Sequence, residues 1–130
     1  MRARAGTAIG SIVAVVAASL ASLVVLAGPA GAVVVNDEAS LRAALANDAE
    51  TSIELAADIV LDDCGAAERS STTDLVIEGN GFSITQTCID ENLKQAESGR
   101  LTLNRLTLIG GVVGIESNGP VELNGSVVTQ

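Results

Sequence analysis

Residues 101–108 read LTLNRLTL and residues 121–128 read VELNGSVV, so the chain repeats one pattern after twenty residues. In each stretch apolar and polar side chains alternate on both sides of an asparagine, a residue that suits a tight corner. Short runs of this kind recur at 53–55, 59–61, 75–77, 82–84, 101–103, 106–108, 121–123 and 126–128. The first runs of successive pairs are spaced by 22, 26 and 20 residues, which predicts a solenoid of about four stacked coils.

A small β-sandwich is the alternative fold, because it also consists of short strands and turns. A sandwich does not predict the near-register match of the two stretches quoted above. Between the paired runs lie Asp58, the stretch GNG at 79–81, Asn104 and Asn124-Gly125. Asn and Gly tolerate the left-handed backbone that a coil corner requires, although hairpin turns are a rival explanation for Asn-Gly pairs. We therefore favour the solenoid.

The stretch NDEASLRAALAND, residues 36–48, predicts a short amphipathic helix. Asn36 or Asp37 suits the N-cap, and acidic residues occupy the first turn. One face of this helix carries Leu41, Ala44 and Leu45. The apolar periodicity then changes from that of a helix to that of strands.

The N-terminus has the features of a secretory signal peptide. Arg2 and Arg4 precede an uncharged apolar run at 7–28, and Ala30 and Ala32 provide small residues for cleavage after Ala32. The run is also long enough for a retained membrane anchor, which is the competing interpretation. We expect a signal peptide at 1–32, a folded domain at 33–130, and a secreted, extracellular or cell-surface product without stable membrane insertion after cleavage.

The mature chain is strongly acidic. All sixteen acids lie in residues 33–130, against five bases, which gives a net charge of −11. Such a charge repels phosphate backbones and anionic lipids, so nucleic-acid and membrane-surface partners are disfavoured.

Cys64 and Cys88 both lie in the mature chain, and an even pair in an oxidising compartment predicts one disulfide. If Leu61 and Ile84 are stacked in successive coils, the two cysteines fall at nearly equivalent points, within the distance that a disulfide spans. The chain has no histidine to complete a zinc site or to activate a cysteine nucleophile. We predict no cofactor and no metal.

The order of SLRAALAND (40–48), TSIELAADIVL (51–61) and LVIEGNGFSIT (75–85) resembles the N-terminal part of bacterial secreted right-handed parallel β-helix proteins. These proteins belong to the pectin-lyase-like superfamily, and IEGNGFSI at 77–84 resembles the GxG corner of its early coils. The resemblance implies a right-handed parallel β-helix whose first coil is capped by the helix. It also implies a relation to pectate lyases and polygalacturonases, which act with clustered acids, calcium or a catalytic Arg or Lys on later coils. No residue here matches those catalytic motifs.

Several charged residues are candidates for a site. Asp62 and Asp63 form an adjacent acidic pair, which is more suited to a weak calcium contact than to catalysis. Residues 88–100 predict a polar loop between coils that carries Asp90, Glu91, Lys94 and Arg100. Arg105 is expected to form an ion pair across coils with Glu116 or Glu122. Polysaccharide binding is weakly supported, because the chain has no Trp or Tyr and its single Phe82 is expected to be buried.

The last residues, SVVTQ at 126–130, read as an apolar strand without a polar cap. Solenoids need capped ends, so we expect either missing coils or self-association at this edge, and a domain that is incomplete at its C-terminus. The predicted function is that of a non-enzymatic surface or interaction protein. The alternative is a truncated, inactive fragment of a polysaccharide lyase or glycoside hydrolase.

Overall fold

A computed structural model describes residues 31–130. The predicted signal peptide falls almost entirely on residues 1–30, outside the described residues, and it stays a prediction. No helix within residues 31–130 has the length and apolar character needed to cross a membrane.

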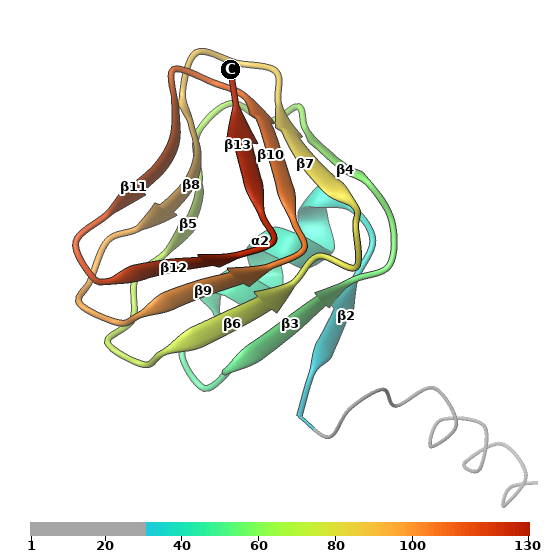
Figure 1. The fold of residues 1–130 in the computed structure, drawn as a ribbon. Helices are drawn as coiled ribbons and strands as arrows, with labels where there is room; N and C mark the ends of the chain where they lie inside the picture. Colours follow the sequence, from blue (N-terminus) through green and yellow to red (C-terminus); the bar gives the residue numbers. More distant parts are fainter. Residues whose placement is uncertain (1–30) are drawn as a thin grey trace, which may run out of the picture. The chain divides into compact units, whose positions relative to one another are not determined.

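The described chain is a parallel β-solenoid with one short helix, as the repeat predicted (Figure 1). Three sheets form the sides of a triangular cross-section. Sheet 1 has the order β12-β9-β6-β3-β2, sheet 2 the order β13-β10-β7-β4, and sheet 3 the order β11-β8-β5. The strands are β2 (Val33–Val35), β3 (Ser52–Leu55), β4 (Ile59–Leu61), β5 (Ala67–Arg69), β6 (Leu75–Glu78), β7 (Ser83–Gln86), β8 (Glu91–Gln95), β9 (Leu101–Asn104), β10 (Thr107–Gly110), β11 (Val113–Ser117), β12 (Val121–Asn124) and β13 (Val127–Thr129).

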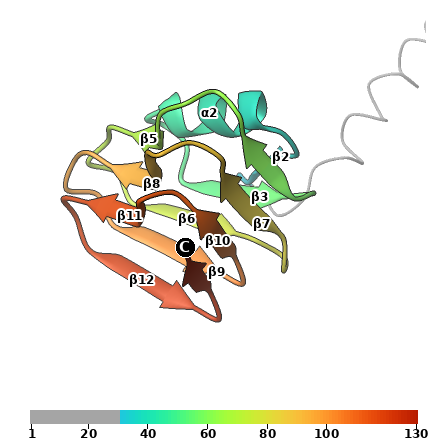
Figure 2. The same cartoon turned by 90° about the horizontal axis from the view of Figure 1, so that it is seen from above.

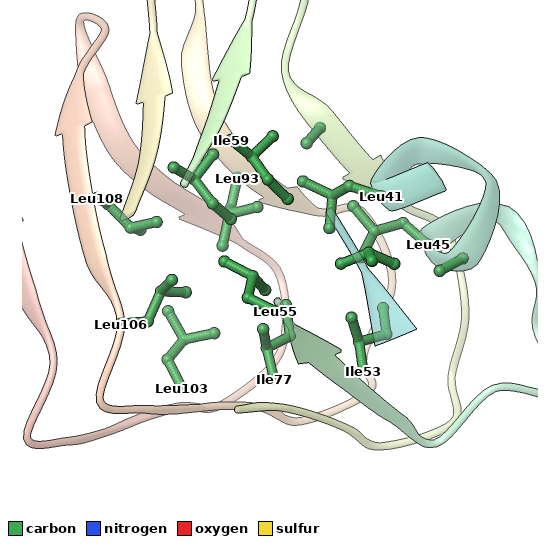
Figure 3. Close-up of a cluster of buried hydrophobic side chains, with 14 of the residues drawn as sticks. Leu41, Leu45, Ile53, Leu55, Ile59, Ile77, Leu93, Leu103, Leu106 and Leu108 are labelled. Atoms are coloured by element: carbon green, nitrogen blue, oxygen red, sulfur yellow. The ribbon is translucent and has the colours of Figure 1, made fainter. Parts of the chain in front are cut away.

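The core consists of columns of aliphatic side chains that run along the solenoid axis. In sheet 1, Ile53 lies beside Ile77, Ile77 beside Leu103, and Leu103 beside Leu123. A second column in sheet 2 joins Ile59, Ile84, Leu108 and Val128. Figure 3 shows Ile53, Ile77 and Leu103 of the first column and Ile59 and Leu108 of the second directed into one cluster, together with Leu93 of sheet 3. The alternation that marked the strands in the sequence is therefore the alternation between core and solvent.

The third strands of the first three coils, β5 (Ala67–Arg69), β8 and β11, were not predicted. Residues 91–95 form β8 rather than part of a polar loop between coils, and residues 113–117 form β11, where no strand was predicted. The second strand of the first coil has the predicted bounds, whereas β7, β10 and β13 each begin one residue later than predicted. For this reason Phe82 precedes β7 and is only partly buried against the core.

The corners use left-handed backbone, but not always at the predicted residue. Asn80 has φ 54°, Gly81 has φ 86° and Gly125 has φ 64°, whereas in the third coil Arg105, with φ 49°, takes this conformation instead of Asn104. Asn104 instead accepts a hydrogen bond of 2.9 Å at its side-chain oxygen from Nδ2 of Asn124 in the next coil. The asparagines at this corner thus support the stacking of coils rather than the turn itself.

Helix α2 (Glu38–Ala46) covers the core at the end formed by the first coil (Figure 2). Asp37 is its N-cap and forms a capping box with Ser40, so two free N–H groups of the first turn are satisfied. The predicted face is confirmed, because Leu41, Ala44 and Leu45 are all buried. The helix therefore closes one end of the solenoid with apolar contacts.

Close stacking of the coils predicts a sensitive position at Gly79. A Cβ atom there would lie 2.5 Å from the carbonyl oxygen of Arg105 and 2.6 Å from Cα of Leu106, both backbone atoms of the next coil. Because a backbone cannot rotate away as a side chain can, we expect Gly79→Ala to lower the free energy of unfolding by about 1–3 kcal/mol. Urea denaturation measures the change. Thr102→Ala, which removes atoms from the outside of sheet 1, is the control and should differ little from the parent.

Candidate functional site

No pocket is present on the described residues 31–130, so candidate sites must be sought on the faces and corners of the solenoid. The sequence singled out charged residues at three places: the Asp62-Asp63 pair, residues 88–100, and Arg105. In the structure these three groups lie apart, and residues of each group form hydrogen bonds or ion pairs with a neighbouring helix or strand.

The predicted disulfide is confirmed. Cys64 and Cys88 lie in successive corners between sheets 2 and 3, with their Cα atoms 5.5 Å apart. The register differs from the prediction by two residues, because Ile84 pairs with Ile59 rather than with Leu61. Asp90 lies beside the two sulfurs, but the sulfurs are bonded to each other and the Asp90 carboxylate accepts the Gly65 N–H at 2.9 Å. This group is therefore a structural link between coils.

Asp62 and Asp63 connect the first coil to helix α2 through their backbone. Both N–H groups donate to the Glu38 carboxylate, and Arg42 donates to the Asp63 carbonyl oxygen at 2.8 Å. Partial burial raises the pKa of Glu38, but hydrogen bonds from Asp63, Arg42 and Asp62 outweigh that effect and hold the pKa below its usual value. The two Asp side chains are exposed. The pair thus anchors the helix, and its carboxylates are not brought together with other acids.

Lys94 lies in a column of charges on the outside of sheet 3. Its ammonium group is 2.8 Å from Glu116 and 3.9 Å from Glu68, which occupy the same position in the adjacent strands β11 and β5. The hydrogen bond to Glu116 is the main reason that the pKa of Lys94 is raised. Arg100 lies elsewhere, 3.8 Å from Glu122. The charged residues of 88–100 are therefore dispersed along the coil and do not converge on one point.

Arg105 forms the predicted ion pair across coils, but with another partner. Its Nε is 3.1 Å from the carboxylate of Glu78, and its guanidinium also donates to the side-chain oxygen of Asn80. The predicted partners, Glu116 and Glu122, are occupied by Lys94 and Arg100. The parallel register places Asn104 beside Glu78, so the following residue reaches back to the previous coil.

Four polar side chains that were not candidates in the sequence are buried: Arg69, Asn92 and Gln95 of sheet 3 and Gln86 of β7 in sheet 2 are all at most 3% exposed. Arg69 donates to the carbonyl oxygens of Asn47 and Glu50, and burial lowers the pKa of its guanidinium. Asn92 donates to the carbonyl oxygens of Ile84 and Ile109. Arg69 thus satisfies carbonyls of the segment between helix α2 and β3, and Asn92 satisfies carbonyls of β7 and β10.

The outer surfaces of the three sheets differ in charge. The outward positions of sheet 1 include Glu54, Glu78 and Glu122, and those of sheet 3 include Glu68, Lys94 and Glu116. The outward positions of sheet 2 form two columns without an ionisable group: Ser83, Thr107 and Val127, and Val60, Thr85, Ile109 and Thr129. We call these seven residues the uncharged face. Asp58 lies at its corner, where its carboxylate accepts the Ser83 N–H at 2.9 Å.

A family model described as a pectate lyase-like adhesive domain matches residues 32–129, which is nearly the whole of the described solenoid. The chain belongs to this family. The match and the parallel coils together confirm the predicted resemblance to pectin-lyase-like β-helix proteins, while bacterial origin stays a prediction.

Membership of the pectate lyase-like adhesive domain family suggests an adhesive or surface role. That role and the disulfide agree with an extracellular location. No curated protein and no solved structure matches the chain.

Proposed function

We propose that the protein is a secreted, non-enzymatic adhesin that attaches to protein surfaces through the uncharged face. The observation that carries the proposal is the contrast between this face and the rest of the molecule. Residues 33–130 have a net charge of −11, yet the seven outward side chains of sheet 2 carry no ionisable group.

The composition of the uncharged face supports a protein target. The centres of protein–protein interfaces are depleted of charged residues. Val60, Ile109 and Val127 are 46%, 37% and 55% exposed, and the hydroxyl groups of Ser83 and Thr85 lie among them. Carbohydrate sites usually present flat aromatic rings, and this chain has no Trp or Tyr. A rigid row of β-branched side chains also loses little rotamer freedom on binding.

The positions of the acids support attachment rather than cleavage of a polysaccharide. Glycoside hydrolysis uses two carboxyl groups at a defined separation across a bound sugar. Here Glu38 holds helix α2, Glu78 holds Arg105, and Glu116 holds Lys94, each on a different part of the surface. These carboxylates contribute to the stacking of elements.

An adhesion assay tests the proposal. Beads that carry the secreted protein are placed on films of mixed serum proteins, of dextran and of polygalacturonate. We expect retention on the protein film, with little on the two polysaccharides. Thr85→Glu and Ile109→Glu place a charge in the middle of the uncharged face and should reduce retention at least about tenfold, which corresponds to about 1.4 kcal/mol.

Thr102→Glu is the matched control, because Thr102 is also a partly exposed threonine but lies on the outside of sheet 1. It adds the same charge and should leave retention unchanged. Equal losses in all three variants would show that net charge, not the uncharged face, controls attachment. Release of unsaturated fragments from polygalacturonate would instead support the lyase alternative and overturn the non-enzymatic proposal.

A further inference from the structure

The end of the solenoid opposite helix α2 is uncovered in the described part of the chain. β11, β12 and β13 are the edge strands of the three sheets there, and we call them together the open end. Each edge strand presents a row of backbone N–H and C=O groups that no further strand within residues 31–130 pairs with. The core columns also end here, because Leu123 and Val128 are 46% and 40% exposed whereas Leu103 and Leu108 are buried.

The two ends of the solenoid are different, which restricts what a second molecule can offer. Helix α2 packs against β2, β4 and β5 at the other end, and Arg42 fixes it to the carbonyl oxygens of Gly65 and Ala66. Stacking one molecule head-to-tail on another would place this helix on the open end. An open end needs three strand edges and an apolar surface as its partner. On a second copy, the open end offers both.

The open end has the shape of a ramp. Each coil adds one strand spacing, about 4.8 Å, along the axis, and the chain passes through β11, β12 and β13 in this order, so the three edge strands rise in steps from β11 to β13. A helical ramp is superposed on itself by a twofold rotation about a line perpendicular to its axis. If that line passes through the middle of β12, the high β13 of one copy meets the low β11 of the other.

From this geometry we propose that two copies of the 130-residue chain form a twofold dimer through their open ends. In the dimer β12 pairs antiparallel with β12 of the second copy, and each β13 pairs antiparallel with β11. The heights are complementary on all three sides, so all three sheets continue across the interface. Leu123 and Val128 become buried, and the same surface serves both copies, as an isologous interface requires.

The size of the open end suits such an interface. At most the twenty residues of the last turn, 111–130, can contribute, which corresponds to the lower end of the about 20–30 residues on each side of a standard specific interface. The charge of the molecules opposes association at long range, because each mature chain carries −11. Salt screens this repulsion, so we expect the dimer to become tighter as ionic strength rises.

Sedimentation velocity on the secreted product of the full chain tests the proposal. We expect a monomer–dimer equilibrium with a dissociation constant in roughly the micromolar range, tightening several-fold between about 50 mM and about 500 mM NaCl. Leu123→Lys and Val128→Lys place a charge in the interface and should weaken the dimer at least about tenfold. Val34→Lys is the matched control, because Val34 is also 46% exposed but lies on β2, away from the open end.

A monomer at every concentration and salt concentration would overturn the proposal. So would a dimer that resists both open-end substitutions, or assemblies larger than two copies, because a twofold interface closes on itself. Cooperative thermal unfolding of the Val34 and Leu123 variants, measured well below the dissociation constant so that dimerisation does not shift the melting temperature, shows that both are folded. Hydrogen exchange gives a second measurement on the parent protein: amides of β11, β12 and β13 should gain protection as the protein concentration rises, and unchanged protection would contradict the interface. The dimer does not depend on the uncharged face, so failure of the adhesion assay leaves this inference intact.

Discussion

Replacing Cys64 and Cys88 together by serine is expected to lower the free energy of unfolding by about 3.5 kcal/mol. The estimate is the loss of chain entropy in the unfolded state when a loop of about 25 residues is closed. For a domain of this size, such a loss is a large share of the total stability. Equilibrium urea denaturation of the parent and the double variant measures the difference.

Two comparisons show whether the loss comes from the covalent bond itself. The parent protein under reducing conditions should lose the same amount of stability as the double variant, and reduction should leave the double variant unchanged. If the serine variant is much less stable than the reduced parent, contacts of the sulfur atoms rather than loop closure hold these corners together.

Ile77→Ala is expected to lower the free energy of unfolding by about 2–5 kcal/mol. Ile77 is fully buried in the middle of the sheet 1 column, between Ile53 and Leu103. Truncation leaves a cavity that neighbouring coils cannot fill, because their backbones are fixed by parallel pairing on both sides. Thermal and urea denaturation measure the change.

Val76→Ala provides the matched control for this column. Val76 is the neighbouring residue on β6, but it faces outward and is 37% exposed. Its truncation should cost less than about 1 kcal/mol, since it removes a half-exposed side chain and leaves no internal cavity. Similar losses of stability for the two variants would contradict the assignment of Ile77 to the core and of Val76 to the outer surface of sheet 1.

Hydrophobic alternation was sufficient to predict the strands of sheet 2, those of sheet 1 except β2, and the solenoid, and helical periodicity predicted helix α2. It failed on sheet 3 for a physical reason. The inward positions of β5 and β8 include Arg69 and Gln95, which are buried because they hydrogen-bond to corner carbonyls. A strand whose core positions are polar does not show the apolar alternation on which the prediction relied.

The partners of individual charges were less predictable than the fold. The disulfide was found from its compartment and spacing, but its register was wrong by two residues because corner lengths are not visible in the sequence. Arg105 was assigned to the wrong glutamates for the same reason. The uncharged face was missed because Thr85 and Ile109 look like ordinary surface residues until parallel pairing aligns them.

The position of the disulfide has a consequence for the behaviour of the molecule under tension. A force applied at the C-terminus pulls β13 away first and can then peel the coils off one at a time. Peeling stops at Cys88, where the covalent bond to Cys64 carries the load. The 42 residues from 89 to 130 would by then extend over about 140 Å. The first coil and helix α2 would remain folded beyond the disulfide. A tethered molecule would therefore lengthen under load before the force unfolds this part.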